Sequence, residues 1–172
     1  MQIIINGKDV ILKAVEETEH HFHTVERWFG KAVSASGETH VADRLGAGVA
    51  AFRLTAGNNT WGAWVQLLGS SDTPADTGKV YYDPHRIEIT VASNTASYFI
   101  QIAAGATGDV ALAAGEYTEF PYTPNTNQID AGPVIIKTDR YLTGTKLWAR
   151  CLCLGQNATT IDMYIGLHEY TE

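Results

Sequence analysis

The sequence has little cysteine and little positive charge, and each scarcity excludes a class of protein. Its 172 residues include two cysteines, too few for the disulfide framework of a small secreted domain. Lys and Arg total 12 against 19 Asp and Glu, which gives a net charge of −7. No basic stripe interrupts this acidic balance, so nucleic acid and an anionic membrane are poor candidate partners. No apolar run approaches the roughly 20 residues of a transmembrane helix. No signal peptide is visible. Because the two cysteines form no disulfide framework, we expect synthesis in a reducing cytoplasm.

The two cysteines lie in KLWARCLCLG, whose residues alternate with the period of a half-buried strand. One face of this strand carries Leu147, Ala149, Cys151 and Cys153. Alternation resumes after the turn residues 155–157, so the stretch predicts a β-hairpin. A redox loop has C-x-x-C spacing and a zinc site needs further ligands nearby. We therefore expect both thiols to be buried and to have no chemical role.

The rest of the chain after about Gly48 is a series of short alternating runs separated by Gly, Asn, Pro and Asp. These runs are GVAAFRLTA, WGAWVQLLG, HRIEITVAS, SYFIQIAA, EYTEFPY and PVIIKTD. We expect no helix among them, because VALAAGEY is short and contains Gly115. With the last hairpin the runs predict an all-β fold, an eight-stranded antiparallel β-sandwich of the jelly-roll type. An immunoglobulin-like sandwich is the alternative, and the missing Cys…Trp…Cys spacing weakens it.

The first residues follow a different pattern. Asn6-Gly7 predicts a tight turn, and a heptad-like apolar stripe then predicts a helix of about 15 residues that ends at Gly30. We therefore divide the chain into an N-terminal attachment arm, residues 1–35, and a jelly-roll domain, residues 36–172. The apolar arm residues that we expect to attach the protein to a partner are Ile11, Val15, Phe22, Val25, Trp28 and Phe29.

The arm also contains the histidine cluster HHFH. On a helix, His20 and His23 would share a face with a nearby glutamate and could hold a metal ion. In an extended chain, His21 and His23 would share a face, and the three chains of a parallel trimer could then place these histidines around a metal on the threefold axis. We favour a solvated polar face without a metal, because no matched second cluster follows.

Motifs for catalysis are missing from the sequence. It contains no nucleophile elbow, no phosphate-binding loop and no H-E-x-x-H, and its carboxylates are scattered. His85 and His168 are too few to support the metal site of a cupin. We therefore expect a protein that is not an enzyme and that has no cofactor.

Large aromatic residues predict contacts between subunits. Trp61 and Trp64 should lie on opposite faces of one strand, so at most one of them can enter a single core, and Trp148 is placed similarly. We expect these three residues at an oligomer interface, because a monomer rarely exposes so much apolar surface. The alternative is a sugar-binding platform that also uses Tyr81, Tyr82 and Tyr98.

Several stretches resemble small structural proteins of tailed bacteriophages. They are GNNTWGAWVQLLGSSDTPA, DPHRIEI, HHFHTVERWFG and KLWARCLCLGQNATTIDMYIGLHEY. The resemblance implies a non-enzymatic virion protein on the capsid surface, a decoration (cement) protein or the base of a head fibre. We expect a homo-oligomer because of the apolar surface, with a trimer as the expected state because a ring of three would suit the quasi-threefold positions of an icosahedral shell. The expected partner is the major capsid protein or another virion protein. A carbohydrate-binding or receptor-binding jelly-roll module of a tail or head fibre is the alternative function.

Overall fold

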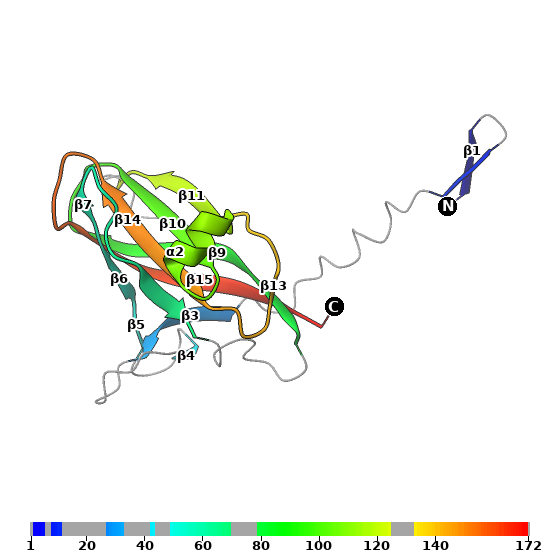
Figure 1. Ribbon diagram of the computed structural model, residues 1–172, viewed down its shortest axis with the longest axis horizontal. Coiled ribbons are helices and arrows are strands. Elements are labelled where there is room, and N and C mark those ends of the chain that lie inside the picture. The colour runs from blue at the N-terminus through cyan, green and yellow to red at the C-terminus, as the bar shows by residue number, and fades with distance from the viewer. Residues whose placement is uncertain are drawn as a thin grey trace.

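A computed structural model describes residues 2–5, 8–11, 27–32, 42–43, 49–69, 79–124 and 133–171. Most of these residues lie in strands. Two sheets pack around a shared core together with one short helix, and two N-terminal strands form a small sheet of their own (Figure 1). The predicted all-β sandwich is therefore confirmed. No helix in this part of the chain is both long enough and apolar enough to cross a membrane.

The first sheet has five strands, with β14 near its middle. β14 pairs with β10 on one side and with β8 and β7 on the other, and β11 lies beyond β10. The bounds of these strands are β7 Gly57–Asn58, β8 Val65–Leu68, β10 Tyr98–Ala104, β11 Tyr117–Tyr122 and β14 Leu147–Cys153.

The second sheet is built around β15. This strand pairs with β9 along one edge and with β6 and β3 along the other. The bounds in this sheet are β3 Arg27–Ala32, β4 Ala42–Asp43, β5 Val49–Ala50, β6 Phe52–Thr55, β9 Tyr81–Ala92, β12 Val134–Ile135, β13 Tyr141–Leu142 and β15 Thr160–Tyr170. Each of the eight predicted runs contains a strand, and short additional strands such as β7 and β13 raise the total above eight.

The core lies between the sheets and is filled by alternate residues of β14 and β15. Every second residue of β14, from Leu147 to Cys153, is fully buried, and so is every second residue of β15 from Ile161 to Leu167. Cys151 and Cys153 are free thiols within this core. The prediction that they are buried apolar side chains is confirmed.

The predicted C-terminal hairpin is wrong. β14 and β15 lie in different sheets, and residues 154–159 carry the chain from one sheet to the other. Two strands that face each other across a core show the same alternation as two strands paired in a hairpin. Periodicity alone could therefore not distinguish the two arrangements.

The expectation that no helix interrupts the strands is also wrong. Helix α2 spans Gly108–Ala114, between β10 and β11, and lies against β10 and β14 (Figure 1). The Thr107 hydroxyl caps it by accepting a hydrogen bond from the Val110 amide at 3.2 Å. Gly115, which appeared to argue against a helix, ends it in the left-handed conformation with φ 79°.

The N-terminal segment pairs on either side of the predicted turn, as expected, but differs from the predicted arm at its other end. β1, Gln2–Ile5, and β2, Lys8–Ile11, pair around the predicted Asn6-Gly7 turn and form a separate two-stranded sheet. β3 pairs with β15, so residues 27–32 belong to the sandwich, and Phe29, at 1% exposure, lies in the core instead of on an attachment surface. Val15, Phe22, Val25 and the HHFH histidines lie outside the described residues.

Burial of the cysteines predicts that they resist modification in the folded protein. Burial raises the pKa of the Cys151 thiol to about 12, and the charge of Cys153 contributes to the same shift. At about pH 8, near the ordinary pKa of a thiol, the reactive thiolate is therefore scarce. We expect no reaction of native protein with the thiol reagent DTNB over minutes, and two equivalents of reaction after unfolding in urea. Rapid reaction of the native protein would contradict this placement.

Candidate functional site

A row of polar side chains crosses the outer face of the five-stranded sheet. Glu119, Gln101 and Arg150 lie directly opposite one another on β11, β10 and β14. Arg150 Nε donates to Gln101 Oε1 at 2.7 Å, and Gln101 Nε2 donates to Glu119 Oε2 at 2.7 Å. The row turns away from the core, because the neighbouring residues Ile100 and Cys151 are core residues.

Two tryptophans contact the arginine of this row. The Arg150 guanidinium carbon lies 4.2 Å from the Trp64 ring centroid and 5.0 Å from that of Trp61. A cation this close to an aromatic ring is attracted by the ring quadrupole. Burial lowers the pKa of Arg150, and the charges of Asp109 and Glu119 oppose that shift. We call Trp61, Trp64, Gln101, Glu119 and Arg150 the tryptophan–arginine cluster.

Helix α2 fixes the indole of Trp64. Trp64 Nε1 donates to Asp109 Oδ1 at 2.8 Å. A Cβ added at Gly108 would lie 2.2 Å from Trp64 Cδ2, so the ring requires glycine at this position. The third tryptophan of this face, Trp148, is anchored by its Nε1, which donates to the Gly105 carbonyl at 3.0 Å. The cluster is therefore built on the sheet and on the segment between β7 and β8, and α2 holds its Trp64 indole in place.

The prediction that Trp61 and Trp64 lie on opposite faces of one strand is wrong. β8 begins at Val65, after both residues, and both indoles reach Arg150. Trp61, Trp64 and Trp148 are all half-buried, and none of them is a core residue. Their role at a subunit interface stays a prediction.

A second cluster lies on the outer face of the other sheet. Asp83 on β9 and His168 on β15 are directly opposite, and Asp83 Oδ1 is 3.4 Å from His168 Nδ1. The His85 and His168 rings lie 4.0 Å apart between centroids. Tyr170 donates from its hydroxyl to Asp83 Oδ2 at 2.7 Å. We call these four residues the histidine–aspartate cluster.

The histidine–aspartate cluster borders a cleft of about 340 Å³. The opposite side of the cleft is formed by residues 135–138 and by Arg140, whose guanidinium carbon is 3.9 Å from the Tyr170 ring centroid. Burial raises the pKa of Tyr170 to about 12; the hydrogen bond to Asp83 and its charge add to the shift, and Arg140 opposes it. His168, although on an outer face, is only 5% exposed.

Sequence reasoning discounted His85 and His168 as too few to form a metal site. The register of β9 on β15 brings them together. Gly166 lies opposite Arg86 and Leu167 lies opposite Pro84, so a β-bulge leaves His85 as an extra residue beside Asp83. The only signal in the sequence was the short motif Asp83-Pro84-His85, and nothing there indicated its partner strand.

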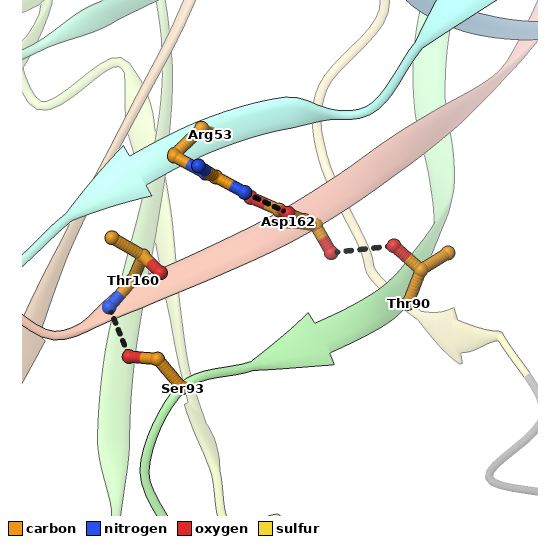
Figure 2. A network of polar contacts seen from close by, with 5 residues as sticks. All are labelled: Arg53, Thr90, Ser93, Thr160 and Asp162. Atoms are coloured by element: carbon orange, nitrogen blue, oxygen red, sulfur yellow. Dashed lines mark hydrogen bonds and ion pairs between the residues drawn. The ribbon is translucent and has the colours of Figure 1, made fainter.

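A third polar network fastens three strands of the second sheet (Figure 2). Arg53 on β6 binds Asp162 on β15 in a fork, with Nε to Oδ1 at 2.7 Å and Nη2 to Oδ2 at 2.6 Å. The Asp162 carbonyl accepts from Thr90 Oγ1 on β9 at 3.2 Å. Near the strand end, the Thr160 amide donates to Ser93 Oγ at 2.7 Å. These groups bind one another across neighbouring strands, so we assign the network to stability of the sheet.

Comparison with known protein families, with curated proteins and with solved structures finds no match. The function must therefore be argued from the arrangement of the residues themselves.

The contact between Gly108 and Trp64 predicts an unusual response to alanine. Replacing a helical glycine by alanine often stabilises a protein by about 0.4–1 kcal/mol. Gly108→Ala should instead lower the free energy of unfolding by about 1–3 kcal/mol, because the new methyl displaces the indole. Urea unfolding followed by tryptophan fluorescence measures the change. Val110→Ala, an exposed site on the same helix, is the control and should change stability by less than about 0.5 kcal/mol. A neutral or stabilising Gly108→Ala would contradict the contact.

Proposed function

We propose that this chain is a non-enzymatic structural protein of a bacteriophage virion, a capsid decoration protein. It would combine a jelly-roll sandwich, which associates with further copies, with an N-terminal segment that binds the capsid surface. The bacteriophage context comes from the resemblance in the sequence. The observation that carries the rest is the pairing order of the strands.

The pairing order supports a jelly roll. Eight strands of the sandwich pair antiparallel, four earlier ones with four later ones in reverse order: β6 with β15, β8 with β14, β9 with β12, and β10 with β11. This is the pattern of one long hairpin. It is then rolled up, so that β9 also pairs with β15 and β10 also pairs with β14. Two Greek keys wound in this way make a jelly roll, a fold found in viral capsid proteins, lectins and cupins.

The separate N-terminal hairpin supports attachment. β1 and β2 pair with each other in a sheet of two strands, distinct from both sheets of the sandwich. An isolated two-stranded hairpin is marginally stable in water, and its outer edges offer unpaired backbone groups. Addition to a sheet of another protein would satisfy those groups. We therefore assign the hairpin to the contact with the capsid.

The tryptophan–arginine cluster supports association of the sandwich with a partner. Trp61, Trp64 and Trp148 are half-buried together on one outer face, and tryptophan and arginine are enriched at interface hot spots. The same face supports a second candidate function, because indole rings beside Gln101, Glu119 and Arg150 are also the groups that bind sugars. The jelly roll itself does not decide between the two functions.

Removal of residues 1–26 tests the attachment segment. Because β3 begins at Arg27, the shortened chain keeps the sandwich and should retain its β-sheet circular dichroism and unfold cooperatively. It should fail to bind capsids that lack the protein, in a co-sedimentation assay. A control chain with residues 1–11 replaced by a Gly/Ser linker of equal length should fail equally. Binding of either chain at the native level would refute attachment through the hairpin.

Mass measurement by light scattering tests the association. We expect an oligomer at micromolar concentration, and a shift toward monomer for Trp61→Ala, Trp64→Ala or Trp148→Ala, because each removes about 1.5–3 kcal/mol of aromatic burial. Trp28→Ala is the matched control, since this half-buried tryptophan lies on the other sheet. A native monomer would contradict the interface. If the native monomer bound a glycan through Trp61, sugar binding, the second candidate function, would replace the decoration-protein proposal.

A further inference from the structure

We propose that the histidine–aspartate cluster is a binding site for one divalent transition-metal ion of the Zn²⁺ type. His85, His168 and Asp83 would be its ligands, and the adjoining cleft would leave room for water at the remaining coordination positions. This site is independent of the proposed virion function, and it lies on the outer face of the second sheet, away from the tryptophan–arginine cluster.

The three side chains offer a ligand set that suits such an ion. One ligating atom from each of Asp83, His85 and His168 lies within 4.8 Å of the other two. Two imidazoles and one carboxylate, with further positions left open, bind zinc and other first-row divalent metals in proteins. Calcium and magnesium are poorer candidates, because they prefer oxygen ligands throughout.

The distances already approach those of a coordinated ion. Two ligands at about 2.0–2.1 Å from a tetrahedral ion are separated by roughly 3.3–3.4 Å. Asp83 Oδ1 and His168 Nδ1 are 3.4 Å apart, which matches this separation. The His85 ring lies 4.0 Å from the His168 ring between centroids, and a ring nitrogen of His85 is within 4.8 Å of both other ligating atoms.

Neighbouring groups hold the ligands in place. Tyr170 donates to Asp83 Oδ2, which orients the carboxylate with Oδ1 toward His168. The backbone of the bulge is fixed as well, because the His85 carbonyl accepts from the Ile136 amide at 2.9 Å and the Pro84 carbonyl accepts from Thr138 Oγ1 at 3.0 Å. Such outer hydrogen bonds typically change metal affinity by about 10- to 100-fold when removed.

The cleft gives the ion access and open positions. Its volume of about 340 Å³ exceeds the roughly 30 Å³ that one water occupies in the liquid. Lys137 and Arg140 line it together with the cluster, so an anion could accompany the ion. The rival explanation is a hydrogen-bonded Asp–His–Tyr group that orders the strand ends without binding any metal, and the experiment must separate the two.

The test is a titration with Co²⁺ and with Zn²⁺ of protein purified without a histidine tag. The full-length chain carries His20→Ala, His21→Ala and His23→Ala, because the HHFH segment is a competing candidate site. We expect one equivalent of Co²⁺ to bind with visible absorption bands, and Zn²⁺ to displace it. Zn²⁺ should also raise the melting temperature, because it binds the folded chain.

Four variants and one control in that background assign the ligands. His85→Ala and Asp83→Asn should each weaken Co²⁺ binding at least about 10-fold, and Tyr170→Phe should weaken it by about 10-fold through the carboxylate it orients. His40→Ala, the remaining histidine outside the cluster, should bind normally. Because His168 is almost fully buried, it is replaced by Gln, which preserves bulk. Thermal melting of the His168→Gln protein without metal checks that this variant is folded.

The rival explanation predicts a different set of results. If the cluster only orders the strands, the background protein binds no equivalent of Co²⁺, and Zn²⁺ leaves its melting temperature unchanged. That outcome would overturn the proposal. Binding that survives unchanged in a folded His85→Ala protein would overturn it equally, because the ion would then lie elsewhere.

Discussion

The short passage of the chain between β14 and β15 is the constraint on which the sandwich depends. These two strands are consecutive in sequence, yet each lies inside a different sheet and has neighbours on both sides. Residues 154–159 must therefore turn the chain across the full thickness of the core. Positive φ angles at Gly155, 72°, and Ala158, 54°, provide the turn. Asn59 holds the turn at two points: its backbone N–H donates to the Cys153 carbonyl at 3.0 Å, and its side-chain Oδ1 accepts from the Gly155 backbone N–H at 2.9 Å.

This crossing determines where chemistry can occur. Because the inner faces of β14 and β15 are committed to the core, their other faces are the ones that present polar side chains. Arg150 on β14 organises the tryptophan–arginine cluster, and His168 on β15 organises the histidine–aspartate cluster. The two clusters therefore lie on opposite outer surfaces of the sandwich. One surface suits association through indoles, and the other suits the binding of an ion.

Local patterns in the sequence predicted what depends on one strand at a time. The alternation Leu147, Ala149, Cys151, Cys153 correctly predicted a buried face that carries both thiols. The same alternation could not reveal that the next strand lies across the core, because both arrangements bury every second residue. Gly115 was misread for a related reason: a glycine that disfavours the inside of a helix is favourable at its end.

Both clusters depend on register between distant strands, which one sequence does not encode in any local pattern. Gln101 meets Arg150 through the pairing of β10 with β14, and His168 meets Asp83 through the pairing of β15 with β9. The bulge that adds His85 is invisible until the two strands are aligned. At most one of Trp61 and Trp64 was expected to enter the core, and neither is a core residue; their common partner, Arg150, was not predicted.

Cross-strand nuclear Overhauser effects measured by NMR on isotopically labelled protein test the crossing most directly. The account predicts backbone contacts of β14 with β10 and β8, and of β15 with β9 and β6, for example between Asp162 and Arg53. It predicts no backbone ladder between β14 and β15. A ladder that pairs Cys153 with Thr160 and continues along both strands would show a hairpin in one sheet and would contradict the account.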